Sequence, residues 1–394
     1  MIGRAAAPTP PAVVLGAGPG GLAAAAELRR HGVDAVVVDR ADAVGASWRG
    51  HYDRLHLHTV RWLSGLPGLP MPRRYGPWVA RDHVVAYLED YVRHHGLEVR
   101  LGTTATGLAP HRDGGFTLRL DEDGGDTSDV CTPVVVVATG HNHTPRLPEW
   151  PGRETFRGEL LHASCYRSAA AYAGRDVLVV GAGNTGAEIA VDLVEHGAAR
   201  VRLAVRTPPH VVRRQVGGVP AQLLSVLLRH VPPPLVDPGV SVLQRLTVGD
   251  LTAYGLPKPT TGMYRRIREA DAIPILDVGL VDALKAGTVD VVAAVERFDH
   301  SDVCLADGSS LRPEVVVVAV GYDHGLEPLV GHLGVLRPDG RPVVHGAQSP
   351  PGLPGLYFTG YTNPVSGMFR ELALDARRIA RAASRLPTSS RSLT

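Results

Sequence analysis

The sequence predicts an α/β protein built from two nested Rossmann-like dinucleotide-binding domains, and an internal repeat is the main reason. Residues 12–40 (AVVLGAGPGGLAAAAELRRHGVDAVVVDR) and 177–206 (VLVVGAGNTGAEIAVDLVEHGAARVRLAVR) each contain an apolar run, a glycine-rich turn, an alanine-containing helical segment and a second apolar run. Residues 134–140 (VVVVATG) and 315–323 (VVVVAVGYD) add continuous β-branched runs. Such runs are typical of parallel strands that are covered on both faces.

The first copy of the repeat fits the fingerprint of a dinucleotide site. Gly16 permits a tight turn after the strand, Gly18 lets the backbone approach a pyrophosphate, and Gly21 lets the helix pack closely on the strand. The helix N-terminus then offers free N–H groups to phosphate. Asp39 ends the second strand, where an acid accepts hydrogen bonds from ribose hydroxyls. This copy suits FAD or NAD, with predicted contacts at Gly16, Gly18, Pro19, Gly20, Gly21, Asp39 and Arg40.

The second copy ends differently, because its second strand closes in Arg206 and has no acid there. An acid would repel a 2′-phosphate, whereas Arg can pair with one through two hydrogen bonds. The copy therefore suits NADP, although a solvated charge at the strand end remains an alternative for Arg206. His210, Arg213 and Arg214 follow closely and could share the role. The other predicted contacts are Gly181, Gly183, Asn184, Thr185 and Gly186.

Two dinucleotide sites in one chain predict electron transfer between two cofactors, a tightly held FAD and an exchangeable NADPH. We expect a discontinuous FAD-binding domain over residues 1–150 and 320–394. The NADPH-binding domain is expected over residues 151–319, with a helical insert around 207–275. Residues 387–394 (PTSSRSLT) are predicted to be disordered.

Three further segments have local signals of secondary structure. Residues 82–96 have helical periodicity, with Asp82 as a candidate N-cap and Gly96 at the end. Alternating and polar stretches between 98 and 138 predict an antiparallel hairpin or three-stranded insert. Residues 365–386 are expected to form a final amphipathic helix with Ser366 as its N-cap.

Composition excludes several classes of partner. The 41 basic and 39 acidic residues leave a net charge of +2, which gives no electrostatic case for nucleic acid or an anionic membrane. No stretch has the roughly 18 apolar residues of a membrane-spanning helix. Cys131, Cys165 and Cys304 lie far apart without a CxxC pair, so neither a disulfide framework nor a metal site is expected. A reducing, cytoplasmic compartment is the simpler interpretation. The oligomeric state is left open.

Between the two copies lies FxGxxxHxxxY, formed by Phe156, Gly158, His162 and Tyr166. At this motif the chain resembles the class B flavin-containing monooxygenases, whose fingerprint it is. The related Baeyer–Villiger enzymes usually carry Trp in place of Tyr166. The resemblance implies that the four residues lie at the crossing between the domains and shape the NADP pocket. A purely structural role for His162 is an equally open interpretation.

Other matches extend the resemblance over nearly the whole chain. The segments YDRLHLHT (52–59), VVATGHN (136–142), PILDVGLVDALKAGTVDVV (274–292), VVVAVGYD (316–323) and LYFTGYT (356–362) look like the YUCCA-type branch. That branch converts an indole keto acid to the acetic acid by oxidative decarboxylation. The resemblance implies a monooxygenase that uses NADPH, O2 and a flavin C4a-hydroperoxide to oxidise a small organic substrate at nitrogen, sulfur or a keto acid. It also implies cofactor contacts at Trp48, Ala138, Thr139, Gly140 and Gly360.

One departure concerns the position beside the flavin, where many family members have an Asn that holds NADP over the ring. This chain has His58 and Thr59 there, which we take as the candidate catalytic residues. Thr59 could supply one hydrogen bond or be a plain loop residue. The alternatives are an FAD-dependent NAD(P)H reductase or oxidase without oxygen transfer, a Baeyer–Villiger-type monooxygenase, and a non-enzymatic FAD-binding scaffold. The absence of CxxC argues against a disulfide reductase.

Overall fold

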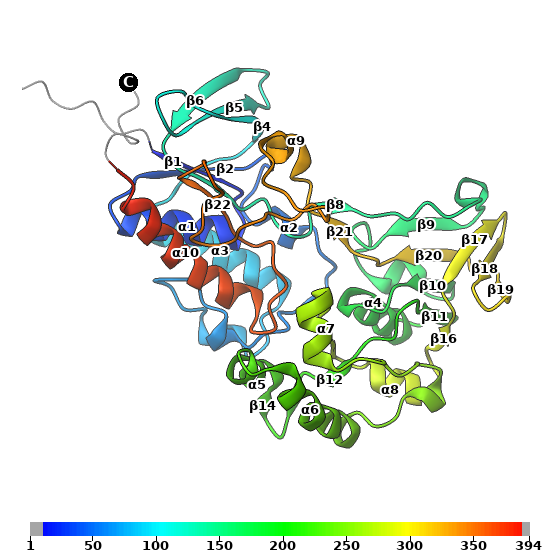
Figure 1. Ribbon diagram of the computed structural model, residues 1–394. Coiled ribbons are helices and arrows are strands. Elements are labelled where there is room, and N and C mark those ends of the chain that lie inside the picture. Colours follow the sequence, from blue (N-terminus) through cyan, green and yellow to red (C-terminus); the bar gives the residue numbers. More distant parts are fainter. Residues whose placement is uncertain (1–10, 388–394) are drawn as a thin grey trace, which may run out of the picture.

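The computed structural model describes residues 11–387 and contains two five-stranded parallel sheets, which lie in opposite halves of the molecule (Figure 1). The first sheet has the order β22-β7-β1-β2-β3, and every neighbouring pair is parallel. Its last strand in sequence lies beside strands from the first 140 residues, so this half is assembled from both ends of the chain. The strands are β1 (Ala12–Leu15), β2 (Ala35–Val38), β3 (Glu98–Arg100), β7 (Val135–Val137) and β22 (Leu356–Phe358).

The second sheet repeats this plan with the order β16-β11-β10-β20-β9, again entirely parallel. The two continuous valine runs, β7 and β20, are the neighbours of β1 and β10 and are fully buried. The predicted α/β class with two Rossmann-like units is thereby confirmed. The strands are β9 (Glu159–His162), β10 (Asp176–Val180), β11 (Arg200–Ala204), β16 (Asp290–Val292) and β20 (Val315–Val318).

Each unit turns from strand to helix through its glycine motif. Gly16 and Gly181, after β1 and β10, both have φ of 112°, a conformation that side chains rarely adopt. A Cβ atom on Gly21 would collide with the carbonyl oxygen of Gly16, and Gly186 stands in the same relation to Gly181. The turns lead directly into α1 (Pro19–Arg30) and α4 (Asn184–Glu195).

Small side chains let helices pack closely over the first sheet. Residues 23–26 of α1 are alanines that are almost completely buried. They share a core with α3 (Arg81–His95) and α10 (Met368–Ser384), which cover the same face (Figure 1). The C-terminal helix therefore completes the unit that begins at the N-terminus.

The segment from 98 to 138 is only partly the predicted antiparallel insert. Strands β4 (Thr103–Pro110), β5 (Phe116–Glu122) and β6 (Thr127–Thr132) form the three-stranded antiparallel sheet. Residues 98–100 and 135–137, however, belong to the parallel sheet. A second small sheet, which the sequence did not predict, is formed by β17 (Val295–Asp299), β18 (Asp302–Leu305) and β19 (Ser310–Leu311).

The segment 207–275 forms a largely helical layer that lies along the lower edge of the molecule in Figure 1, below the junction of the two halves. Its helices are α5 (Ala221–Leu228), α6 (Pro233–Thr247) and α7 (Met263–Ala270), and its first strand, β12 (Val211–Arg213), pairs in parallel with β15 (Ile275–Asp277). The remaining elements are short: α2 (Ala46–Arg49), α8 (Leu280–Lys285), α9 (Glu327–Val330), β8 (Thr144–Pro145), β13 (Gln215–Val216), β14 (Val219–Pro220) and β21 (Tyr322–Asp323).

Two predicted helix caps are wrong. The N-cap of α3 is Ala80, and Asp82 instead lies in the first turn, where its charge still favours the positive helix end. The N-cap of α10 is Gly367, while the hydroxyl of Ser366 donates to Glu371 at 2.6 Å. Gly96 ends α3, as predicted, and has the left-handed conformation. The tail predicted to be disordered is 387–394, of which residues 388–394 lie outside the described residues.

No helix within residues 11–387 has the length and apolar character needed to cross a membrane.

The linker that follows β9 is fixed to α4 by one buried tyrosine. Tyr166 is fully buried, and its hydroxyl donates to Oδ2 of Asp192 at 2.6 Å. The same oxygen accepts from the backbone N–H of Ala169 at 3.1 Å. Because Asp192 is itself buried, its carboxylate depends on these donors.

Replacing this hydroxyl should therefore destabilise the protein. We expect Tyr166→Phe to lower the free energy of unfolding by about 1–3 kcal/mol, the typical cost of leaving a buried acceptor short of a partner. Chemical denaturation of the variant measures the loss. Tyr172→Phe is the control, since that hydroxyl reaches the exposed Glu159 only at 3.3 Å and should matter less. Equal stability of the wild type and Tyr166→Phe would contradict the prediction.

Candidate active site

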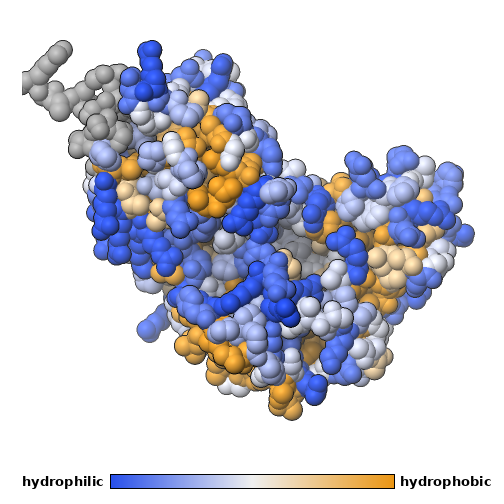
Figure 2. All heavy atoms as spheres, in the orientation of Figure 1, coloured by the Kyte–Doolittle hydropathy of each residue, from blue (hydrophilic) through white to orange (hydrophobic). Residues whose placement is uncertain are grey.

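One cavity of about 1380 Å³ opens between the two halves and receives both glycine turns. Figure 2 shows the molecule hollowed at this place. Ordinary ligand pockets measure roughly 300–1,000 Å³, so this one has room for more than one ligand. Most of the predicted contacts line it: Gly16, Gly18, Pro19, Gly20, Asp39, Arg40, Trp48, Ala138, Thr139, Gly140 and Gly360 from the first unit, and Gly183, Asn184 and Thr185 from the second.

The first glycine turn fits a dinucleotide. A Cβ atom on Gly18 would meet nothing within 4 Å, so the backbone is open to the cavity at this point. No side chain caps the N-terminus of α1, which leaves its first N–H groups free for phosphate. The carboxylate of Asp39 is held by the backbone N–H groups of Ala17 at 2.6 Å and Ala41 at 2.9 Å. Gly21 lies behind the cavity wall and serves the close packing of α1 on β1.

The far side of the first site is formed where β7 and β22 end. The buried hydroxyl of Tyr361 lies 2.8 Å from the hydroxyl of Thr139 and accepts from the backbone N–H of Thr139 at 3.1 Å. This contact fixes the Ala138–Gly140 turn beside Gly360, so that both turns face the cavity.

The second glycine turn has the same backbone form as the first but different neighbouring side chains. Gly183 again has open space where a Cβ would lie. The side chain of Asn184 is occupied by β15, since it donates to Pro274 at 3.1 Å and accepts from Leu276 at 2.8 Å. Gly181 and Gly186 lie behind the wall. Arg206 is exposed just beyond β11, outside the cavity lining, and has no ion pair among the described residues.

The four residues of the FxGxxxHxxxY motif lie one layer behind the cavity. Phe156 packs against Phe298 with ring centroids 5.2 Å apart, and a Cβ on Gly158 would collide with the ring of Phe156. His162 accepts from the backbone of Ser164 at 3.0 Å and donates to the carbonyl of Gly321 at 3.1 Å. Burial lowers the pKa of His162. Tyr166 is the buried linker residue described above, so a direct role of the motif in the NADP pocket stays a prediction.

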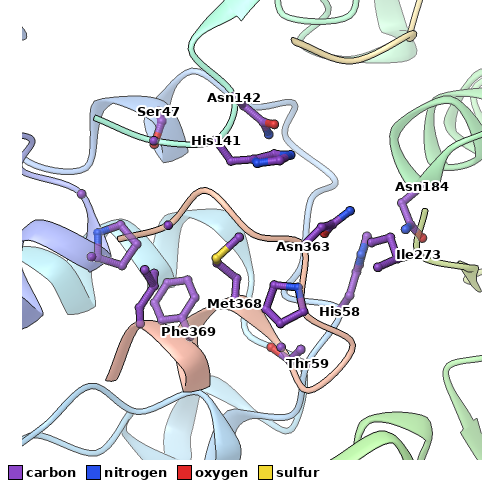
Figure 3. A pocket seen from close by; sticks show the side chains of 18 of the residues that line it. Ser47, His58, Thr59, His141, Asn142, Asn184, Ile273, Asn363, Met368 and Phe369 are labelled. Carbon is purple, nitrogen blue, oxygen red and sulfur yellow. The ribbon is translucent and has the colours of Figure 1, made fainter. Parts of the chain in front are cut away.

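Both candidate catalytic residues line the cavity (Figure 3). Nε2 of His58 hydrogen-bonds to Oε1 of Glu188, which lies on α4 of the second unit. The hydroxyl of Thr59 lies 2.8 Å from that of Ser64. Since the Ser64 hydroxyl donates to the carbonyl of Val60, Thr59 is the donor in this pair.

Several lining residues were missed by the sequence reasoning. His141, Asn142 and Asn363 project into the cavity in Figure 3. His141 and Asn142 lie in the segment 136–142, which was quoted only as a family match, and Asn363 directly follows the segment 356–362. Gln222 on α5 carries no motif at all. Its side chain accepts from the N–H of Val60 at 2.8 Å and donates to the carbonyl of Ser366 at 2.7 Å, which fastens the helical layer to the first unit.

The helical layer gives the cavity an apolar wall. Arg213, a charged residue of this layer that lines the cavity, is neutralised because it pairs with the buried Asp277 at 2.5 Å and with Asp282 at 3.2 Å. A ligand in this part of the cavity therefore meets mainly hydrocarbon. The apolar lining side chains are Val216, Val219, Leu224, Val240, Leu243, Met263 and Ile267.

Two glycine turns of the dinucleotide-binding form that face one cavity are typical of oxidoreductases of the two-dinucleotide flavoprotein class. Residues 13–216 match the family model of the pyridine nucleotide-disulphide oxidoreductases. Over 357 residues the chain is 37% identical to indole-3-pyruvate monooxygenase YUCCA1 of Oryza sativa subsp. japonica, and the match covers 90% of this chain and 87% of that protein. A flavin-containing monooxygenase from Stenotrophomonas maltophilia superposes with a TM-score of 0.70 at 25% identity, covering 95% of this chain and 98% of that one.

The chain belongs to the class B flavin-dependent monooxygenases, which confirms the resemblance to the YUCCA-type branch. It is an oxidoreductase that uses FAD, NADPH and O2 to oxidise a small molecule. The fold alone would not separate these enzymes from reductases. A bacillithiol disulfide reductase from Bacillus cereus shares the fold with a TM-score of 0.69 at 17% identity, covering 96% of this chain and 99% of that one. The sequence identity to enzymes named monooxygenases is what separates this chain from the reductases.

His141 gives the site a measurable pH dependence. Burial, followed by the neighbouring His324 and Arg341, lowers the pKa of His141 from 6.5 to about 4. Its Nδ1 is buried without a hydrogen-bond partner in the described structure. Between these two pH values the unfolded chain binds a proton at this residue and the folded protein does not. Above pH 6.5 the imidazole of His141 is neutral in both states and does not oppose folding. As the pH falls from 6.5 towards 4, protonation of the unfolded chain lowers the free energy of unfolding.

We accordingly expect His141→Gln to lose less stability than the wild type when the pH is lowered from about 7 to about 5. Urea denaturation at both pH values measures this difference. His94→Gln, at an exposed position of α3, should behave like the wild type. If His141→Gln lost as much stability as the wild type, His141 would not be the titrating group.

Proposed function

We propose that this monooxygenase oxidatively decarboxylates an aryl 2-oxo acid. The observation that supports this most strongly is the identity of 31–37% to curated relatives named indole-3-pyruvate monooxygenases or probable ones, over most of their length. The apolar wall from the helical layer suits an aromatic side chain. The proposed reaction converts the 2-oxo acid, O2, NADPH and one proton into the carboxylic acid one carbon shorter, CO2, water and NADP⁺.

The two cofactors are proposed to occupy the two glycine turns. In this proposal residues 1–150 and 320–394 bind FAD, and 151–319 bind NADPH. FAD, when bound, carries electrons from the nicotinamide to dioxygen and presents the oxygen atom to the substrate. The N-terminus of α1 holds the pyrophosphate, and Asp39, fixed by two backbone N–H groups, accepts the ribose hydroxyls.

Other residues orient and shield the reacting groups. Gly367 and Met368 line the cavity at the N-terminus of α10, whose partial positive charge would stabilise negative charge on the reduced ring. The helical layer would exclude water from the substrate through its hydrocarbon lining. Gln222 holds that layer in place against the two loops of the first unit.

We also propose a cytoplasmic location. Cys131, Cys165 and Cys304 are all unpaired thiols in the structure, which is the usual state of cysteine in a reducing compartment.

The reaction can be tested with labelled dioxygen. Purified enzyme, NADPH and indole-3-pyruvate or phenylpyruvate under ¹⁸O2 should yield the shortened acid with one labelled oxygen in its carboxylate, and one CO2 per NADPH. Mass spectrometry of the acid measures the label. The reaction is run with and without catalase, because peroxide released from ¹⁸O2 would decarboxylate a 2-oxo acid without the enzyme and give the same label. Formation of the labelled acid should not be lowered by catalase. An unlabelled acid, or peroxide as the sole product, would refute the proposed reaction.

The NADPH site can be tested at Arg206. Loss of a charge-assisted pair with the 2′-phosphate should raise the KM of Arg206→Ala for NADPH about tenfold or more, and change the KM for NADH less than about twofold. Initial rates with each nucleotide measure both values. Arg200→Ala is the matched control, since Arg200 begins the same strand and pairs with Asp290 at 3.1 Å. Equal changes in KM for NADPH and NADH would show that Arg206 does not bind the 2′-phosphate.

A further inference from the structure

A buried carboxylate joins the two units beside the cavity. Glu188 lies on α4 of the second unit and is 3% exposed. Its two oxygens are both used by one segment of the first unit, because Tyr52 donates to Oε2 at 2.9 Å and Nε2 of His58 contacts Oε1. A buried carboxylate is costly unless it is hydrogen-bonded, so these two donors are what allow it to lie here.

The contact fixes the chemistry of the imidazole. An ionised carboxylate only accepts hydrogen bonds, so Nε2 of His58 carries the hydrogen. Burial raises the pKa of Tyr52 well above its ordinary value, and Glu188 adds to this, so Tyr52 stays protonated and remains a donor. His58 uses no other side-chain or backbone partner within residues 11–387, and its side chain is 22% exposed. Nδ1 is therefore the free nitrogen.

His58 lies where the two cofactor sites meet. Figure 3 shows it beside Thr59 and Asn363 of the first unit and close to Ile273 of the helical layer. Gly183 and Asn184 of the second glycine turn line the same cavity. A group on the His58 imidazole is thus within the space that flavin, nicotinamide and substrate must share.

The reaction needs a proton at this place. Monooxygenation of a substrate S is NADPH + H⁺ + O2 + S → NADP⁺ + SO + H2O. NADPH supplies two electrons and the substrate two more, the O–O bond breaks, one oxygen bonds to S, and the other leaves as water. That leaving oxygen must take up a proton. General acids of this kind contribute about 10²–10⁴ in rate.

Other imidazoles in the cavity lining are poorly suited to this task. Burial lowers the pKa of His51, His141 and His143, which makes their charged forms rare. None of these three has a carboxylate as a hydrogen-bond partner in the described structure. His56, the fifth histidine of the lining, is exposed, and its Nδ1 lies 2.7 Å from the carbonyl oxygen of Arg54. His58 alone among the five has a buried carboxylate as its hydrogen-bond partner, which holds the ring in one orientation.

We propose that His58, positioned by Glu188, delivers the proton to the oxygen atom that leaves as water. His58 acts from Nδ1 and regains its proton from solvent at the cavity mouth. Glu188 is a positioning residue that keeps the hydrogen on Nε2 and turns Nδ1 towards the cavity. Because Glu188 lies on α4 of the second unit, it positions His58 only while the two units are docked. The inference rests on the proposed function for its substrate, but requires only that the enzyme transfers oxygen.

The experiment compares the wild type with His58→Ala, His58→Gln, Glu188→Gln and the control Glu195→Gln. Glu195 lies on the same helix and pairs across the units with Arg54, but it does not line the cavity. We measure anaerobic flavin reduction by NADPH, and then, in air, product per NADPH with catalase present and peroxide per NADPH without catalase. The substrates are phenylpyruvate and, separately, methyl phenyl sulfide.

Both His58 variants should reduce the flavin within about twofold of the wild-type rate, yet form product about a hundredfold more slowly, with peroxide in its place. Added imidazole should restore product formation in His58→Ala at least about tenfold. The rate of product formation in Glu188→Gln should lie between those of the wild type and the His58 variants, and the rate in Glu195→Gln should match the wild type. Unchanged product per NADPH in His58→Gln, or no rescue by imidazole, would overturn the proposal. Sulfoxide without decarboxylation would reject the 2-oxo acid while still testing His58.

A spectroscopic measurement tests the positioning without catalysis. In ¹⁵N-histidine-labelled oxidised protein, the imidazole signal that disappears in His58→Gln should show the Nε2–H tautomer. Glu188→Gln should convert it to a tautomer mixture, and Glu195→Gln should leave it unchanged. An Nδ1–H tautomer in the wild type would contradict the assignment of roles to the two nitrogens.

Discussion

The missing side chain at two glycines is the constraint on which the rest of the structure depends. A Cβ atom on Gly21 or Gly186 would collide with the carbonyl oxygen of the first glycine of its turn. Only glycine lets each helix start directly against its strand, with its free N–H groups directed into the cavity. Since both units obey this constraint, the chain presents two phosphate sites to one shared space.

The cavity itself is made by contacts between the halves rather than within them. Glu188 receives donors from the first unit, and Gln222 binds two loops of that unit through one side chain. Both residues are buried, so each contact holds only in the assembled structure. The geometry of the reacting groups is thus tied to the docking of the two units, which is what a reaction between two bound cofactors requires.

The fold and the chemistry are separable in this architecture. A bacillithiol disulfide reductase shares the fold, and one fold can carry different activities. The activity must therefore be argued from the cavity wall of this chain. That wall consists of aliphatic side chains from the helical layer and an imidazole backed by a carboxylate, with no cysteine pair among the described residues. These features suit transfer of oxygen to an apolar substrate in the absence of water.

The sequence by itself determined the two units and their glycine turns, because strand, turn and helix lie close together in each repeat and follow local rules of backbone geometry. It failed at helix caps such as Asp82 and Ser366, where a shift of two residues and of one residue changes which residue caps the helix. Only the tertiary structure decided that His58 meets Glu188, 130 residues away, and that Gln222 closes the cavity. Contacts of this range depend on how packed units dock, and no local pattern in the chain records that.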